Sequence, residues 1–403
     1  MFCNCYELTT IGDVSNWDTS KVDNMSYMFA QCKKLTAVNV SNWDVSKVTT
    51  IGDMFTNCNT IKSVDLSNWK TDSLVDVAGL FFHCTSLTSF GNISNWDTDG
   101  IVNMRSMFDG CTKISIINLR NWKPNALYSA MAAFEFCDTL TTLDISNLKL
   151  QNDTLTEVIF KGSTNLKYIS CNDVNTLNLI KSELLTRTAE DPGYIVCNAD
   201  TTDLDITTLN SKNWRLATAE DMVTVAQYKY DKSIYEDFMP QFNDGADYPV
   251  FVRDEVDGNI VTRTLEIVNG MELPWEITFG VKSTNAVDND GKQMCLLEVN
   301  FINTNNITGM KYMFNWCENL TKVNTEGWDT SKVRSMEFMF RACINLTSLD
   351  VSNWDTSNLI YAQSLFNNCR SLTSLDVSNF DTRNVTTTSH TSGRTISAEQ
   401  TQR

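Results

Sequence analysis

The stretch LTAVNVSNWDVSKVTTIGDMFTNC, residues 35–58, decides the fold because the chain repeats it. Residues 87–111 read LTSFGNISNWDTDGIVNMRSMFDGC and residues 346–369 read LTSLDVSNWDTSNLIYAQSLFNNC, so apolar, turn and cysteine positions recur together. A fixed period of a few tens of residues is the signature of a solenoid, because one copy cannot bury its own apolar face and must stack on its neighbours.

Two columns of residues keep this register along the chain. The first is aromatic, with steps of 26 or 27 residues inside each section: Trp17, Trp43, Trp69, Trp96, Trp122, Trp328, Trp354 and Phe380. The second is made of cysteines: Cys5, Cys32, Cys58, Cys84, Cys111, Cys137, Cys317, Cys343 and Cys369. Together they predict one repeat array in residues 1–174 and a second in residues 294–385.

Each copy has two halves with different periodicity. Residues 35–43 alternate apolar and polar side chains near their end, which predicts a short strand with one buried face. In the second half apolar residues recur three or four positions apart, which predicts a helical turn or two. Its members in one copy are Val22, Met25, Met28, Phe29, Cys32 and Leu35. Asp18, Thr19 and Ser20 would cap that helix. Stacked copies would form a parallel sheet, about 4.8 Å per step.

The strand half matches the L-x-x-L-x-L core of the leucine-rich repeat, with Trp where that motif has Asn or Cys. The longer pattern, with SNWDTSKV at residues 15–22 followed by NM, MF, C and LT, resembles the bacterial surface leucine-rich repeats of the BspA type. The resemblance covers about residues 1–175 and 295–385. It implies a cell-surface or extracellular protein that adheres to host proteins or other cells without catalysis. Related repeats in gut phages imply an alternative, a virion or tail component that touches the host.

The expected fold class is α/β: a leucine-rich-repeat solenoid in two arrays with an intervening small antiparallel β module. Residues 175–219 resemble a closing cap of the first array. Residues 220–293 carry the hairpin signals Asp257-Gly258, Asn269-Gly270 and Asp290-Gly291. They would form either an independent domain or a leader strand set that caps the next solenoid. Residues 386–403 have no apolar stripe, which predicts a disordered tail.

Both ends of the chain interrupt the repeat. Met1-Phe2 with Cys5 and Leu8 matches Met28-Phe29 with Cys32 and Leu35, so the first copy begins in its middle. The register continues through Val385 and then stops. We therefore expect a fragment of a longer protein. The alternative is a naturally uncapped chain whose open coil docks on a partner.

Composition narrows the possible partners. The formal net charge is −17, and no basic cluster offsets it, which argues against binding nucleic acid. No apolar run approaches the roughly 18 residues of a membrane-spanning helix, so we expect no membrane insertion in this segment. The expected partner is a host or bacterial surface protein or glycan, with avidity if several copies are displayed together.

The 13 cysteines could indicate disulfides or metal binding. We favour a third interpretation for the nine that form one column, in which Cys is a small hydrophobe at a repeated core site. Ser163 falls 26 residues after Cys137 in that column, so a hydroxyl is tolerated there. The remaining four, Cys3, Cys171, Cys197 and Cys295, lack the C-x-x-C spacing of zinc sites. We therefore expect neither a metal nor a cofactor.

Catalytic signatures are nearly absent. The chain has two histidines, His83 and His390, so few residues could serve as the histidine of a Ser-His-Asp or Cys-His catalytic site. Paired carboxylates could still serve a carbohydrate-active enzyme, with residues 220–293 as the best place for a cleft. We regard that as the less favoured alternative and expect no enzyme.

A column of polar residues on the predicted strands is the candidate binding face. Its members are Asn39, Asp65, Asn118, Asp144, Asn324, Asp350 and Asp376. Projecting from an exposed sheet face, they could bind a basic protein surface, a sugar chain or a divalent cation, or they could simply be solvated. A second column follows the aromatic residue and predicts Asx turns or helix caps rather than calcium ligands: Asp18, Asp44, Asp97, Asp329, Asp355 and Asp381. The aromatic column itself predicts core rather than a sugar-stacking platform, because Leu148 and Phe380 replace Trp without a change of register.

Overall fold

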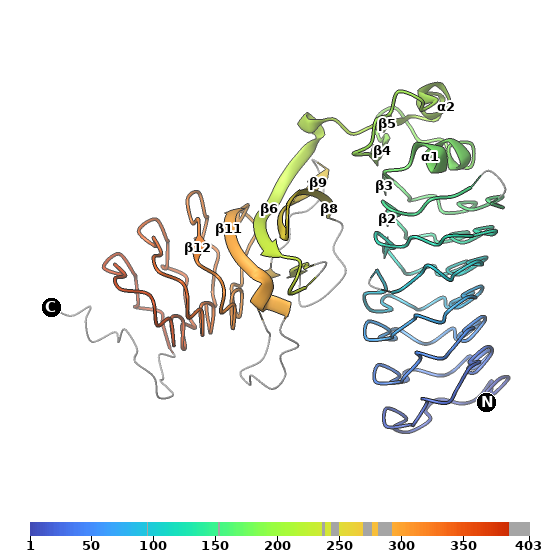
Figure 1. Cartoon of the computed structure of the whole chain (residues 1–403), viewed down its shortest axis with the longest axis horizontal. Coiled ribbons are helices and arrows are strands. Elements are labelled where there is room, and N and C mark those ends of the chain that lie inside the picture. The colour runs from blue at the N-terminus through green and yellow to red at the C-terminus, as the bar shows by residue number, and fades with distance from the viewer. Residues whose placement is uncertain are drawn as a thin grey trace. The chain divides into compact units, whose positions relative to one another are not determined.

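The computed structural model describes residues 1–94, 96–151, 154–235, 238–242, 250–268, 276–280 and 292–386, apart from the side chains of residues 241, 242, 292, 301 and 302. The chain forms two compact units, Met1–Thr218 and Ala219–Arg403. Each unit has its own hydrophobic core. In Figure 1 each unit contains a stack of flat coils, blue to green in the first and orange to red in the second.

Successive coils of the first unit pair in parallel. Five short strands form a sheet in the order β1-β2-β3-β4-β5: β1 (Ile116–Asn118), β2 (Thr142–Asp144), β3 (Tyr168–Ser170), β4 (Gly193–Val196) and β5 (Trp214–Leu216). From β1 to β4 the partners lie 26 residues apart, as in the pairing of Ile116 with Thr142. A second ladder of single bridges runs through Asn24, Thr50, Asp76, Asn103, Ser129 and Leu155. The predicted solenoid of stacked parallel copies is confirmed.

The second half of each copy is a run of tight turns, so the prediction of a helical segment in every repeat is wrong. In the copy that ends at Cys32, the N–H groups of Met28, Ala30 and Cys32 bond to the carbonyl three residues back. The N–H groups between them cross to the next coil over 2.7–3.1 Å, from Met25 to Thr50, Tyr27 to Gly52, Phe29 to Met54 and Gln31 to Thr56. Every backbone N–H of this segment is thus satisfied without a helix.

Left-handed backbone explains why no helix forms here. Tyr27 has a φ of 58° and Gln31 a φ of 64°. Later copies repeat these values at Asp53, Asn57, Gly79, His83, Ser106, Gly110, Ala132 and Phe136. A residue at positive φ interrupts a right-handed helix and turns the neighbouring N–H groups towards the adjacent coil. Consecutive turns also bring side chains three or four positions apart onto one face, which is why the apolar spacing resembled that of a helix.

Two short helices lie near the end of the first unit, α1 (Val174–Ile180) and α2 (Ile206–Ser211). The carboxylate of Asp173 caps α1 by accepting a hydrogen bond from the N–H of Thr176 at 2.7 Å. Asp205 caps α2 in the same way. Helices of this length are marginal alone, so the caps and the packing of their apolar faces stabilise them.

Stacked aromatic rings form the centre of the repeat core. The rings of Trp69 and Trp96 are parallel to within 7° with centroids 6.1 Å apart. A second ladder runs through the phenylalanines Phe29, Phe55, Phe81, Phe108, Phe134 and Phe160. The indole N–H groups of Trp43, Trp69, Trp96 and Trp122 each donate to a carbonyl of an earlier coil, as from Trp69 to Val40 at 2.9 Å. The prediction that the Trp column is core is confirmed for the buried coils, while Trp17 at the edge of the stack is 38 % exposed.

The cysteine column lies in the same core except for Cys5, which is exposed, and Cys369, which is half-buried. Buried members of the column make a repeated hydrogen bond. The thiol of Cys84 donates to the carbonyl of Phe55 at 3.0 Å, and that of Cys111 to Phe81 at 3.2 Å. Ser163 occupies the same site, and its hydroxyl donates to the carbonyl of Phe134 at 2.5 Å. All the cysteines are free thiols. The column is therefore a buried donor as well as a small hydrophobe, which explains why serine can replace cysteine.

Exposed cysteines should react faster with a thiol reagent than buried cysteines. Burial raises the pKa of the Cys84 thiol to about 12, so almost none of the nucleophilic thiolate is present at pH 8. We expect an alkylating reagent to modify the exposed Cys3 and Cys5 rapidly in the folded protein and Cys84 only after unfolding in urea. Peptide mass spectrometry at timed intervals measures this. Equal labelling rates for Cys3 and Cys84 would contradict the buried column.

A sheet with antiparallel pairing, apart from one parallel pair of strands, begins the second unit. Its order is β12-β11-β6-β9-β8, with β6 (Met222–Asp231), β8 (Phe251–Asp257), β9 (Ile260–Val268), β11 (Leu296–Ile302) and β12 (Lys322–Val323). A two-residue turn, Gly258-Asn259, joins β8 to β9, with Gly258 at a φ of 60°. That φ at the first central position is typical of a type II′ turn. A small pair, β7 (Gln241–Phe242) and β10 (Ile277–Thr278), and the 3-10 turns η1 (Ala219–Asp221) and η4 (Lys292–Cys295) complete the module.

Strand β11 belongs to both the antiparallel module and the second array. It pairs antiparallel with β6 on one side and parallel with β12 on the other. Val225 and Phe238 of the module share one core cluster with Met313 and Phe340 of the array. The strands of residues 222–268 and the coils that follow β11 therefore share one sheet and one hydrophobic core.

Residues 276–280 of the module take the place of a coil at the start of the second array. Glu276 bridges Gly309 in parallel, and the N–H groups of Phe279 and Gly280 bond to the carbonyl of Met313 at 2.7 and 2.9 Å. The ring of Phe279 stacks on that of Phe314 with centroids 5.6 Å apart. The phenylalanine ladder of the second array therefore begins inside the module. The predicted turns at Asn269-Gly270 and Asp290-Gly291 and the predicted tail from residue 387 on lie outside the described residues.

Candidate binding surface

The seven residues of the candidate binding face, here called the polar column, share one local geometry. The side-chain Oδ1 of each accepts a hydrogen bond from the backbone N–H two residues later, over 2.9–3.3 Å: Asn39, Asp65, Asn118, Asp144, Asn324, Asp350 and Asp376. This is the Asx turn, which fixes the side chain against its own backbone. The polar column thus helps to turn the chain at the end of each strand segment, a role that the sequence had assigned to the other Asp column.

Asp144 differs from the other members. It is 6 % exposed, and Ser146, which donates to it, is in turn hydrogen-bonded to Ser170 at 2.6 Å. The expectation that Asp144 faces solvent is therefore wrong, because this hydroxyl network covers it. Asn118 is half-buried, and the remaining members are exposed.

Hydrogen bonds hold two exposed members of the polar column in the ionised form. The hydroxyl and N–H of Ser352 lower the pKa of Asp350, and those of Ser378 lower the pKa of Asp376. A hydrogen bond donated to a carboxylate stabilises its charged form. These carboxylates are therefore negative throughout the neutral and mildly acidic range.

The Asp column that follows the aromatic residue makes the Asx turns that the sequence predicts. Each of its members accepts a hydrogen bond from the N–H two residues later: Asp18, Asp44, Asp97, Asp329, Asp355 and Asp381. The prediction of turn formation is confirmed. The helix-cap alternative is wrong for these positions, because the segment after them is not helical.

A buried carboxyl pair lies on the side of the first unit and was missed by the sequence analysis. Asp109 is 7 % exposed and Glu135 9 % exposed, and Asp109 Oδ1 has no hydrogen-bond partner in the described part of the chain. Lys161 forms an ion pair with Glu135 at 3.4 Å. Burial, followed by the charge of Glu135, raises the pKa of Asp109 to about 6, against smaller opposing effects of His83, Ser106 and Lys161. The 26-residue steps from His83 to Lys161 are a signal that could have found this cluster.

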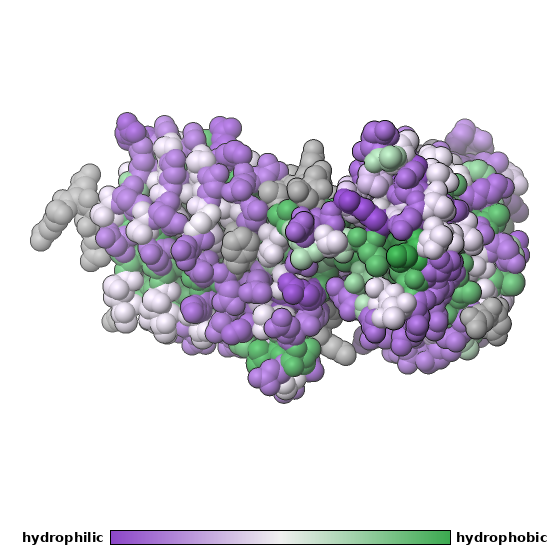
Figure 2. All heavy atoms as spheres, turned by 90° about the horizontal axis from the view of Figure 1, so that it is seen from above, coloured by the Kyte–Doolittle hydropathy of each residue, from purple (hydrophilic) through white to green (hydrophobic). Residues whose placement is uncertain are grey.

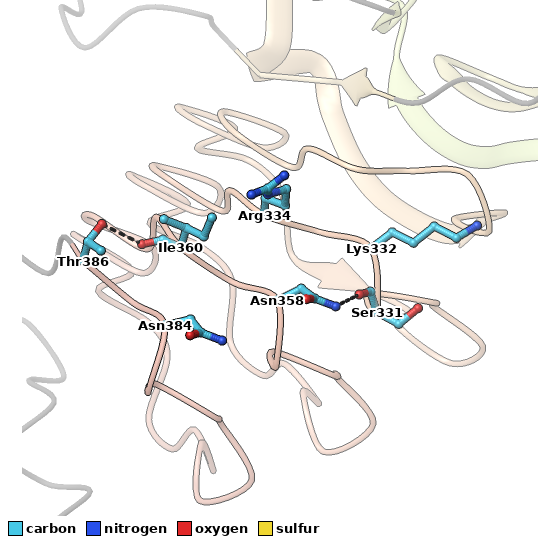
Figure 3. Close-up of a pocket in the computed structure, with 7 residues that line it drawn as sticks. All are labelled: Ser331, Lys332, Arg334, Asn358, Ile360, Asn384 and Thr386. Carbon is cyan, nitrogen blue, oxygen red and sulfur yellow. Dashed lines mark hydrogen bonds between the residues drawn. The ribbon is translucent and has the colours of Figure 1, made fainter.

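A shallow hollow of about 690 Å³ lies on the side of the second array (Figure 3). Three successive coils line it in register, through Ser331, Lys332, Arg334, Asn358, Ile360, Asn384 and Thr386. Asn358 donates to the carbonyl of Ser331 at 2.8 Å and Lys332 to that of Asn305. These side chains are therefore occupied in tying neighbouring coils together, and the hollow is a consequence of the repeat.

The remaining surface gives little sign of other chemistry. Hydrophilic residues cover most of the face seen in Figure 2, broken by local hydrophobic patches. Among the described residues no cluster of three or more His, Cys, Asp or Glu side chains is placed to hold a metal ion. None of the helices in the described part of the chain is both long and apolar enough to cross a membrane.

Comparison with known proteins places these repeats in a family. The family model described as "Mycoplasma protein of unknown function, DUF285" matches residues 1–90, 64–173 and 284–402, more than half of the chain. Among solved structures, the chain is similar to a leucine-rich repeat protein from Bacteroides ovatus ATCC 8483, with 15 % identity, a TM-score of 0.22, and coverage of 85 % of this chain and 79 % of that chain. No curated protein matches the chain. The chain therefore belongs to the family described as Mycoplasma protein of unknown function, DUF285.

Proposed function

We propose that the chain is a non-enzymatic binding protein in which the polar column, without the buried Asp144, contacts a basic protein surface. The observation that carries the proposal is the repeated Asx geometry, which fixes the orientation of every member on its own backbone. Fixed side chains lose little conformational freedom on binding, so they contribute more affinity than mobile ones. A ligand with basic groups spaced like the coils would contact several members at once.

The overall charge supports a basic partner. The net charge of −17 attracts cationic surfaces over a distance of roughly one Debye length, about 8 Å at physiological salt. Asp65, Asp350 and Asp376 add fixed negative charge on exposed coils. Each contact of this kind is weak, and the sum grows with the number of coils engaged and with the number of copies displayed.

The proposed setting follows from the repeat type. As a two-array protein similar to the BspA type, with an antiparallel module between the arrays, the chain would act at a cell surface or outside the cell as an adhesin. The alternative is a phage virion or tail protein that binds the host. A glycan is the alternative ligand, because amide and carboxylate groups in a row also suit sugar hydroxyls.

Replacing Asp65, Asp350 and Asp376 by Asn tests the role of the polar column. Asn keeps the Oδ1 acceptor that the turn needs, as Asn39, Asn118 and Asn324 already show at equivalent positions. The triple variant therefore loses charge but not structure. We expect about tenfold weaker binding of the labelled protein to cultured animal cells and to poly-L-lysine, since three partly screened ion pairs amount to about 1.5 kcal/mol.

The matched control is the triple variant Asp18→Asn, Asp44→Asn and Asp355→Asn, which removes the same charge from the other Asx column. It should bind more tightly than the polar-column variant. Equal losses would show that total charge decides binding and not the polar column, and unchanged binding by the polar-column variant would overturn the proposal. Loss of binding after glycosidase treatment of the cells, but not after protease, would assign a glycan ligand instead.

A further inference from the structure

A line of exposed residues runs along one side of the first unit, at the same position in six successive coils. We call it the edge strip; its members are Asp23, Thr49, Val75, Val102, Tyr128 and Leu155. Each backbone N–H along it donates to the carbonyl of the preceding member over 2.8–2.9 Å. This hydrogen-bonded ladder makes the strip a rigid surface, with its side chains spaced by the coil repeat.

The last four members of the edge strip are apolar, and three of them are exposed to solvent. Val75 is 39 % exposed, Tyr128 52 % and Leu155 44 %, and Val102 between them is half-buried. Single exposed apolar residues are ordinary on a protein surface, but a continuous row of them indicates an interaction site. Tyrosine is also among the residues that contribute most to binding at interfaces.

The other end of the edge strip is acidic. Asp23 lies on it, and Asp53 and Asp76 lie close enough to the 55 %-exposed Tyr27 for their charges to raise its pKa. Asp72 and Asp99 are exposed in the turns that precede Val75 and Val102. The apolar row is therefore bordered by negative charge.

We propose that the edge strip binds an amphipathic helix of a partner protein that carries lysine or arginine beside its apolar face. The coils present the apolar side chains about 4.8 Å apart, and a helix repeats its own apolar face about every 5.4 Å, so the two rows match over some three turns. The acidic border selects a basic helix by charge complementarity. A second copy of this chain is disfavoured because each copy carries a net charge of −17.

This surface is distinct from the polar column, so the inference stands apart from the proposed function. The probe is a fluorescent 18-residue Leu/Lys peptide with leucine at helical spacing, and the measurement is its anisotropy when titrated with the full chain. The edge-strip variant combines Val75→Thr, Tyr128→Ser and Leu155→Ser. We expect it to bind the peptide at least about tenfold more weakly than the unmodified chain.

The matched control replaces three exposed apolar residues of the second unit, Val256→Thr, Tyr361→Ser and Ile234→Ser, and should bind within about twofold of the unmodified chain. Asp72→Asn with Asp99→Asn should weaken binding and reduce its salt dependence. The polar-column variant should bind the peptide normally, which keeps this test separate from that of the proposed function.

Three results would overturn the inference. The edge-strip and control variants could bind the peptide alike, which would remove the strip as the site. A Ser/Lys peptide could bind as tightly as the Leu/Lys peptide, which would leave charge as the sole attraction. The chain could form a dimer in sedimentation experiments that the edge-strip variant abolishes, which would assign the strip to a second copy.

Discussion

Replacing Gly280 by Ala should destabilise the second unit by about 3 kcal/mol, because overpacking against an immovable backbone cannot be relieved. A Cβ at residue 280 would lie 2.3 Å from the N of Asn315, 2.5 Å from its O and 2.6 Å from the O of Tyr312. All three are backbone atoms of the adjoining coil. The added carbon would push residues 276–280 away from the second array and break the bonds to Met313.

Scanning calorimetry of the full chain measures this effect as a lower transition temperature. Gly309→Ala is the control. Gly309 lies in the same unit, and a Cβ added there would have no atom within 4 Å. It should leave the transition nearly unchanged. If Gly280→Ala were as stable as Gly309→Ala, the module would not be seated on the second array through residues 276–280.

Replacing Asp109 by Asn should stabilise the first unit at pH 7 by up to about 3 kcal/mol and remove a pH dependence. Burial and Glu135 raise the pKa of Asp109 from 3.8 to about 6 in the folded chain. Between these values the folded state binds more protons than the unfolded state. Stability contributed by Asp109 is therefore lost as the pH rises from about 4 to about 6, and an uncharged amide avoids that loss.

Thermal unfolding of the full chain at pH 4.5, 6 and 7.5 measures whether the stability contributed by Asp109 falls as the pH rises. The unmodified first unit should lose stability relative to Asp109→Asn as the pH increases. Asp44→Asn, in the same unit, is the control: hydrogen bonds from Ser46 lower the pKa of the exposed Asp44, so its difference in stability from the unmodified chain should not change with pH over this range. A parallel pH dependence of the unmodified chain and Asp109→Asn would show that the buried pair does not carry the charge assigned to it.

The buried core was predictable from the repeat period, because equivalent residues of a solenoid share one environment. Trp69 and Trp96 stack as the aromatic column predicts. Ser163 in the cysteine column predicted that a hydroxyl group fits at the cysteine position. The carboxyl pair was not predicted, although Asp109 and Glu135 occupy one repeat position, because that position also holds Phe82 and Lys161 and no residue type marks it as buried. The pKa of Asp109 is raised because both carboxyl groups are buried, and their burial depends on how the coils pack.

The sequence by itself determined that the repeated aromatic, aliphatic and cysteine side chains point inward and that successive copies stack, since a 26-residue period allows one register. The tertiary structure decided what the backbone between them does. Met25 and Phe29 have the spacing of a helix, but their N–H groups bond to Thr50 and Met54 of the next coil. These hydrogen bonds can form only when the next coil is stacked beside the first. For the same reason the junction at β11 and the edge strip from Val75 to Leu155 became visible only in the folded stack.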